Sequence, residues 1–118
     1  MTVTEPRYIR ITPGKCRDSE GRIVLKGSPY ALERIYMGIN DNDGCLIQAW
    51  GLVGKRVNVE VEVDGVVLAF KAKVRRKGLV GLEFWLPKRF RQLFNNVTQV
   101  VVRLKPIEGD GCGNGAGS

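Results

Sequence analysis

Residues 56–74 read RVNVEVEVDGVVLAFKAKV, and their alternation predicts the central element of the fold. From Arg56 to Val63 every second residue is apolar, which is the period of a strand with one face toward a core. The core-facing residues are Val57, Val59, Val61 and Val63. Asp64-Gly65 is a dipeptide that favours the two-residue type I′ turn. Val66–Val74 would then return as the antiparallel partner strand.

The outward side chains of this hairpin carry charges of both signs. Glu60 and Glu62 point outward on the first strand, and Lys71 and Lys73 point outward on the second. We expect the two lysines to lie opposite the two glutamates, where each cross-strand pair contributes about 0.2–1 kcal/mol. On this interpretation the lysines stabilise the sheet and belong to no ligand site.

The chain before the hairpin predicts two strands and a short helix. Arg7–Thr12 and Arg22–Lys26 alternate like short strands. Ser28 followed by Pro29 is typical of a helix N-cap with proline at the first helical position, and Gly38 is typical of a helix end. We therefore predict a helix over residues 29–37, with an apolar face formed by Leu32, Ile35 and Tyr36.

The polar run Asn40–Gly44 predicts a turn, because Asn and Asp side chains bond to their own backbone. A calcium-binding loop beginning at Asp41 would need an oxygen ligand at its fifth position and a glutamate at its twelfth. Cys45 and Leu52 occupy those positions, so the plain turn is the better interpretation. The apolar run 45–50 then predicts a buried strand.

After the hairpin, the chain predicts a basic turn, two further strands and a second helix. The turn carries Arg75, Arg76 and Lys77 and ends at Gly78. Residues 79–86 and 98–104 have the composition of strands. Pro87 begins a helix over residues 88–94, which Asn95-Asn96 closes. Its packing face would consist of Phe90, Leu93 and Phe94.

The regular turn signals between short strands predict the fold class. We expect a mostly β (α+β) protein, a small β-barrel or sandwich of six to eight short strands with two short helices. Residues 1–108 form a single β-rich domain on this prediction. Residues 109–118 are a Gly-rich tail with nothing to bury, and we expect it to be disordered.

The net charge of +7 is concentrated in one half of the chain. Residues 1–64 hold nine basic and nine acidic residues, whereas residues 65–107 hold ten basic residues and one acid, Glu83. A localised positive field raises the local concentration of polyanions. The alternative is a charged surface that keeps the protein soluble.

Several residue types that define other functions are missing. The sequence has no histidine, which excludes Ser–His and Cys–His nucleophiles and histidine metal ligands. We predict no enzyme, no catalytic residue, no metal site and no cofactor. No apolar run reaches the roughly 20 residues that span a bilayer, and the N-terminus does not have the pattern of a signal peptide. We therefore expect no membrane partner.

The cysteines bear on the compartment. Cys16, Cys45 and Cys112 include no Cys-x-x-Cys pair, which argues against a zinc site. A disulfide between Cys16 and Cys45 stays open as an alternative. Buried or idle thiols are the better interpretation, and with them a cytoplasmic location.

The run Leu86–Phe94, which reads LPKRFRQLF, and the strand 97–104 after it resemble the second half of an AbrB/MazE-type swapped-hairpin DNA-binding domain. In that family a strand leads into Pro-Lys, a short helix with arginine and then a β-hairpin. An earlier segment, with the expected helix 30–37 and strand 45–50, resembles the same order. The resemblance covers about half the chain and implies two half-copies that contact DNA through arginines.

We predict a nucleic-acid-binding protein with DNA as the favoured ligand, a transcriptional regulator or chromatin-type protein. The candidate phosphate contacts are Arg75, Arg76, Lys77, Lys88, Arg89 and Arg91. Trp85 or Phe84 could stack on an unpaired base, and we name Trp85 as the candidate site residue. Alternation puts the two on opposite faces, so we expect at least one of them to pack in the core. Two alternatives stay open, a single-stranded DNA- or RNA-binding β-barrel and a protein-interaction or viral assembly module with an acidic partner. A homodimer is compatible with each.

Overall fold

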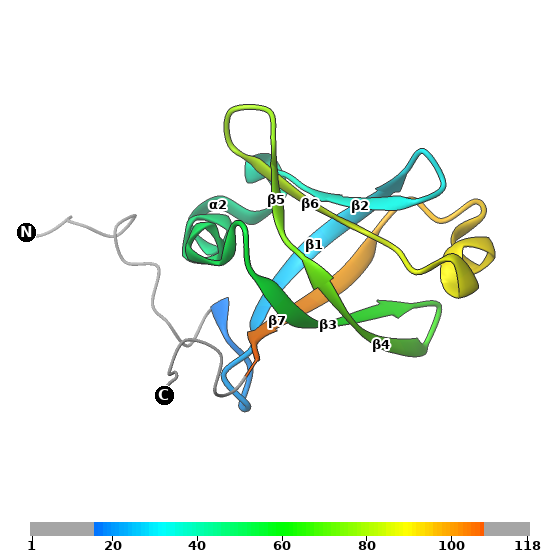
Figure 1. Ribbon diagram of the computed structural model, residues 1–118, viewed down its shortest axis with the longest axis horizontal. Helices are drawn as coiled ribbons and strands as arrows, with labels where there is room; N and C mark the ends of the chain where they lie inside the picture. The colour runs from blue at the N-terminus through cyan, green and yellow to red at the C-terminus, as the bar shows by residue number, and fades with distance from the viewer. Residues whose placement is uncertain (1–15, 108–118) are drawn as a thin grey trace, which may run out of the picture.

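The computed structural model describes residues 16–107, which form one antiparallel sheet of seven strands (Figure 1). The strand order is β4-β3-β7-β1-β2-β6-β5. The strands are β1 (Ile23–Tyr30), β2 (Arg34–Met37), β3 (Arg56–Val63), β4 (Val66–Lys73), β5 (Arg75–Lys77), β6 (Gly81–Trp85) and β7 (Val100–Pro106). The mostly β prediction is confirmed. The strand expected at Arg7–Thr12, the tail 109–118 and Cys112 lie outside the described residues.

The hairpin of β3 and β4 is the one that the sequence predicts. Val63 pairs with Val66 across the turn, where Asp64 and Gly65 have φ angles of 49° and 80°. Positive φ at both central residues defines the type I′ turn. The four alternating valines of β3 are buried, as expected.

The charge pairing that we expected across this hairpin is wrong. Because the turn has two residues, Lys71 lies opposite Asn58 and Lys73 opposite Arg56. Glu60 faces Ala69 in β4, and its carboxylate pairs instead with Arg22 at 2.7 Å. Arg103 in β7 donates to Glu62 at 2.7 Å. The glutamates are therefore satisfied without the lysines.

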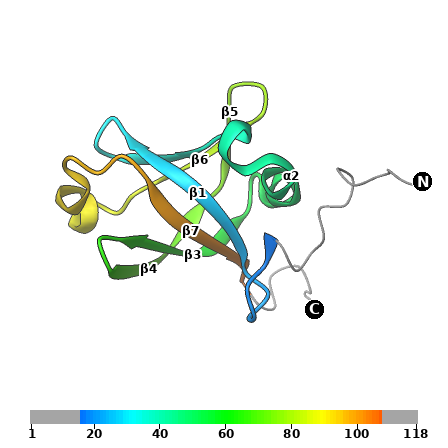
Figure 2. The same cartoon turned by 180° about the vertical axis from the view of Figure 1, so that it is seen from behind.

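The sheet curls into a half-barrel because two segments of the chain serve both of its halves (Figures 1 and 2). The first five residues of β1 pair with β7, and the last three pair with β2. A Cβ on Gly27, at the end of the first of these stretches, would lie 2.7 Å from Ile35 Cγ2, so the close approach requires glycine. The second segment is 66–77, where Val74 joins β4 to β5 and so links the two edges of the sheet.

The helix predicted over residues 29–37 is wrong. Pro29 continues β1 and pairs with Ile35 in β2. The chain reverses at Ala31 and Leu32, which have φ angles of 56° and 58°. Leu32 is 64% exposed, while Ile35 and Met37 are buried, so the burial has the period of a strand.

The turn and strand predicted over residues 40–50 are also wrong, since the segment is helix α2 (Ile39–Ala49). Asn42, Leu46 and Ala49 form its buried face at spacings of four and three residues. The turn-forming character of the polar run survives only as a break at Asp43, with φ 45° and ψ −131°. A 3₁₀ helix, η2 (Trp50–Leu52), follows.

The second predicted helix is present as a 3₁₀ helix, η3 (Lys88–Phe94). Phe94 is buried and Phe90 packs against the core, but Leu93 is 47% exposed and does not join the packing face. Asn96 has a φ of 65°, the left-handed conformation expected of it at the helix end. Figures 1 and 2 show α2 at one end of the curled sheet and η3 at the other.

A disulfide joins Cys16 to Cys45. The prediction of buried or idle thiols is therefore wrong for this pair. The bond joins cysteines 29 residues apart in the sequence, and it ties α2 to the segment before β1. Structural disulfides are typical of oxidising compartments, so the thiol argument for a cytoplasmic location loses its premise. The location itself stays a prediction.

Candidate nucleic-acid interface

Four basic side chains form a row along the continuous segment of β4 and β5. They are the exposed residues Lys71, Lys73, Arg75 and Lys77, and we call them the cationic row. Ala72 and Val74 alternate with them and are buried. In an extended chain, side chains two residues apart recur about every 6–7 Å. The pleat therefore presents a regular line of positive charge to solvent.

No acid neutralises this row within the described residues 16–107. None of their ion pairs includes a member of the cationic row. The acid opposite Arg75 in the sheet is Glu83, which is only 8% exposed. Its carboxylate accepts a hydrogen bond from the Tyr30 hydroxyl and lies 3.7 Å from the Arg34 guanidinium. Burial raises the pKa of the Glu83 carboxyl.

A groove of about 250 Å³ lies beside the row, where β4 and β5 approach the end of β6. It brings together four cations from three strands and one large aromatic side chain. The lining residues are Arg56, Lys71, Ala72, Lys73, Arg75, Trp85, Leu86 and Pro87. This lining combines positive charge with an aromatic surface, which is what binding of phosphates and bases requires.

Trp85 presents its indole at the surface, 42% exposed, while Phe84 is buried. The Arg34 guanidinium lies 4.4 Å from the Trp85 ring and 5.2 Å from the Tyr30 ring. Such cation–π contacts fix the guanidinium against the indole. The indole is therefore positioned before any ligand arrives.

The structure brings only part of the predicted site together. Arg75 and Trp85 line the groove, and Lys77 continues the row beyond it. Arg75, Arg76 and Lys77 belong to strand β5 and not to the expected turn. Arg76 donates to the Leu79 carbonyl at 2.8 Å and lies over the Trp50 ring, which directs it away from the row.

The predicted residues on η3 have different surroundings. Lys88 and Arg89 are exposed beyond the groove, and the Arg89 guanidinium lies 4.5 Å from the Phe90 ring. Arg91 donates to the Leu86 carbonyl at 3.0 Å and pairs with Glu33 at 3.6 Å. Arg91 therefore has a structural role that the charge count alone does not show.

Three cations of the groove were missing from the predicted site, namely Arg56, Lys71 and Lys73. The signal for them was present in the sequence. A two-residue turn at Asp64-Gly65 fixes the register, and counting outward from it puts the lysines opposite Asn58 and Arg56. The glutamates then cannot neutralise them.

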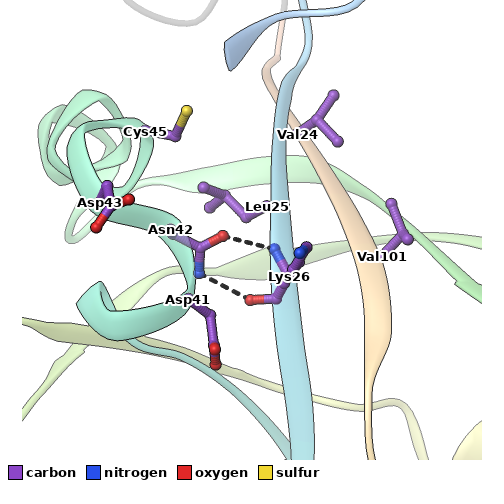
Figure 3. Close-up of a pocket in the computed structure, with 8 residues that line it drawn as sticks. All are labelled: Val24, Leu25, Lys26, Asp41, Asn42, Asp43, Cys45 and Val101. Atoms are coloured by element: carbon purple, nitrogen blue, oxygen red, sulfur yellow. Dashed lines mark hydrogen bonds between the residues drawn. The ribbon is translucent and has the colours of Figure 1, made fainter. Parts of the chain in front are cut away.

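A second cavity, of about 320 Å³, lies between α2 and β1 (Figure 3). Its central side chain is Asn42, which accepts from the Lys26 backbone N–H at 2.7 Å and donates to the Lys26 carbonyl at 2.9 Å. A third bond reaches the Gly38 carbonyl at 3.0 Å. Figure 3 shows Asp43 pointing away from β1. Because the Asn42 amide makes two hydrogen bonds to β1 and one to the start of α2, we assign it a structural role.

Comparison with known proteins adds no relative. The chain matches no protein-family model, and no curated protein or solved structure is similar enough to match. The resemblance to AbrB/MazE-type domains therefore stays a prediction. Among the described residues, no three His, Cys, Asp or Glu side chains are grouped so that they could hold a metal ion. None of the helices in that part of the chain is long and apolar enough to cross a membrane.

Proposed function

We propose that this protein binds nucleic acid through the cationic row and the groove beside it. The observation that carries the proposal is the regular line of four cations, none with an acidic partner among residues 16–107, which passes an exposed tryptophan. DNA is the favoured ligand, and a sequence-tolerant role of the transcriptional-regulator or chromatin type would follow. The polar side chains of the groove are lysines and arginines, so phosphate contacts supply most of the affinity.

The chemistry of the row fits phosphates. Each lysine or arginine that contacts a phosphate releases condensed counterions, so affinity falls steeply with salt. Arg56, which lies opposite Lys73 in the sheet and also lines the groove, would contact the same backbone. Trp85 can stack on any base, because every base has a π face.

The test is a salt titration of binding to labelled duplex DNA, single-stranded DNA and RNA of equal length. The Lys71→Gln/Lys73→Gln variant should weaken binding and reduce the slope of log affinity against log salt by about 1.4–1.8. Its matched control is Arg17→Gln/Lys26→Gln, which changes the net charge equally at two exposed positions before and on β1. The control should retain the slope.

Two results would overturn the proposal. Equal losses in both variants would show that affinity follows net charge and not the cationic row. Absence of binding to all three nucleic acids at low salt would instead favour a protein-interaction module with an acidic partner.

A further inference from the structure

The outer face of β1, β2 and β6 carries an aromatic corner beside the cationic row. Its floor is Tyr36, which lies against the backbone of Gly81 in β6. A Cβ on Gly81 would lie 2.7 Å from the Tyr36 hydroxyl oxygen, so only glycine lets the ring rest there. Gly38 has a similar relation, since its Cβ would lie 2.9 Å from the Tyr36 ring. Two glycines thus hold one tyrosine flat on the sheet.

The wall of the corner is Tyr30. Its ring is nearly perpendicular to that of Tyr36, at 86°, with centroids 6.4 Å apart. The Lys77 ammonium, the last cation of the row, lies 5.4 Å from the Tyr30 ring centroid. Together with Ser28 and Gly78 these residues line a cavity of about 450 Å³. That volume is within the range of about 300–1,000 Å³ that small-molecule sites occupy.

We infer that this corner receives an unpaired nucleobase of the bound strand, so that single-stranded nucleic acid is the preferred ligand. The inference rests on the proposed function and deepens it. The base stacks on the Tyr36 ring against Tyr30, and the phosphate next to it contacts Lys77. The Ser28 hydroxyl can bond the edge of the base. A paired base in a duplex presents no free face and cannot enter.

The test uses two single-stranded probes of about 12 nucleotides, the length range that one small β domain covers. One is oligothymidylate, and the other has the same backbone with abasic sites. Tyr36→Leu should weaken oligothymidylate binding about 5- to 150-fold, as loss of one stacked base does. It should leave abasic binding unchanged. Tyr36→Phe keeps the ring and should bind like the wild type.

A cross-linking experiment on the wild type keeps the test decisive if Tyr36→Leu does not fold. Photoactivation of bound 5-iodouracil oligonucleotide should label the peptide that contains Tyr30 or Tyr36. Labelling of Trp85 alone would overturn the base-binding corner while leaving the proposed function intact. Equal affinity for oligothymidylate, the abasic strand and duplex would do the same. If none of these probes binds, the proposed function fails first.

Discussion

Glu83 is a buried acid that lies beneath an exposed basic face without neutralising it. Its position in β6 puts it on the outer side of the sheet, opposite Arg75 and Tyr36. The Tyr30 hydroxyl donates to its carboxylate, and the Arg34 guanidinium lies 3.7 Å away. Desolvation nevertheless raises its pKa above the ordinary value of 4.5. The carboxylate is thus partly withdrawn from solvent and does not compete with a polyanion.

The raised pKa of Glu83 predicts a pH dependence of stability. Since the folded protein holds this proton more tightly than the unfolded chain, the associated stability is complete below the unfolded pKa. It is lost as pH rises through the folded pKa. Glu83→Gln removes this titration, so the melting temperature of the wild type should fall relative to that of the variant between pH 4 and pH 7, measured by thermal unfolding. The exposed Glu20→Gln serves as a control, and a constant difference for Glu83→Gln would contradict the prediction.

The site residues also show what single positions in a sequence can and cannot reveal. Trp85 and Arg75 could be predicted, because alternation and the acid-poor second half both follow from residue order. The engagement of Arg91 with Glu33 could not, since the two lie far apart in the chain. The aromatic corner was equally hidden, because it depends on two glycines beneath Tyr36 that only the sheet register brings there.

At the scale of elements, the β1–β2 turn explains the largest error in secondary structure. Ala31 and Leu32 both adopt positive φ, which costs roughly 1–2 kcal/mol for a residue with a side chain. Turns with positive φ at both central residues are usually recognisable by Asn, Asp or Gly in the sequence. Asp64-Gly65 is an example, in the hairpin that was predicted correctly. Without that signal, the helical spacing of Leu32 and Ile35 and the proline at position 29 favour a helix. Tertiary pairing with β6 and β7 overrides this local preference.

Helix α2 docks on β1 through Asn42, whose amide makes the hydrogen bonds that the backbone of a neighbouring strand would make. The N–H and C=O of Lys26 face α2, and no strand among residues 16–107 pairs with that side of β1 at this point. The Asn42 amide supplies both a donor and an acceptor to them, as a neighbouring backbone would (Figure 3). A buried peptide group must be satisfied in some way, so this bond fixes where the helix sits.

Asn42→Ala should therefore destabilise the protein far more than an ordinary surface change. It removes three hydrogen bonds and leaves backbone groups unpaired, a loss of about 2–4 kcal/mol in the free energy of unfolding. Urea denaturation followed by circular dichroism measures this loss. Asn40→Ala, an exposed change in the same helix, should stay within about 0.5 kcal/mol of the wild type. Similar values for the two variants would show that the amide does not hold the helix.

On the scale of the whole molecule, the curled sheet gathers basic residues from the acid-poor second half of the chain on one exposed face. On one half of the sheet, Glu60 and Glu62 of β3 form ion pairs with Arg22 and Arg103. The segment 66–77 runs from this half to the other, with Lys71 and Lys73 on β4 and Arg75 and Lys77 on β5, and none of the four has an ion pair among residues 16–107. A linear count of charge predicted the excess, but only the closure of the sheet by one continuous segment places Lys71, Lys73 and Arg75 in one groove with Trp85.

The Cys16–Cys45 disulfide is expected to stabilise the folded molecule. It closes a loop over β1, β2 and the start of α2, and a loop with that separation of 29 residues contributes about 3–4 kcal/mol by restricting the unfolded chain. Cys112→Ser leaves these two as the only cysteines in the sequence. In that background, reductant should lower the melting temperature by about 10–20 °C. An unchanged melting temperature would mean that the bond is absent in solution.

A second variant, Cys45→Ser in the Cys112→Ser background, separates the effect of the disulfide on stability from any effect on binding. Neither cysteine lines the groove or the aromatic corner, and α2 does not contribute to the cationic row. Cys45→Ser should therefore melt like the reduced protein, whether or not reductant is added. Well below that melting temperature it should bind nucleic acid with unchanged affinity and an unchanged salt slope, because the proposed contacts lie on strands of the sheet and not on α2. A loss of affinity in the folded variant would show that α2 and its covalent tie control the geometry of the interface.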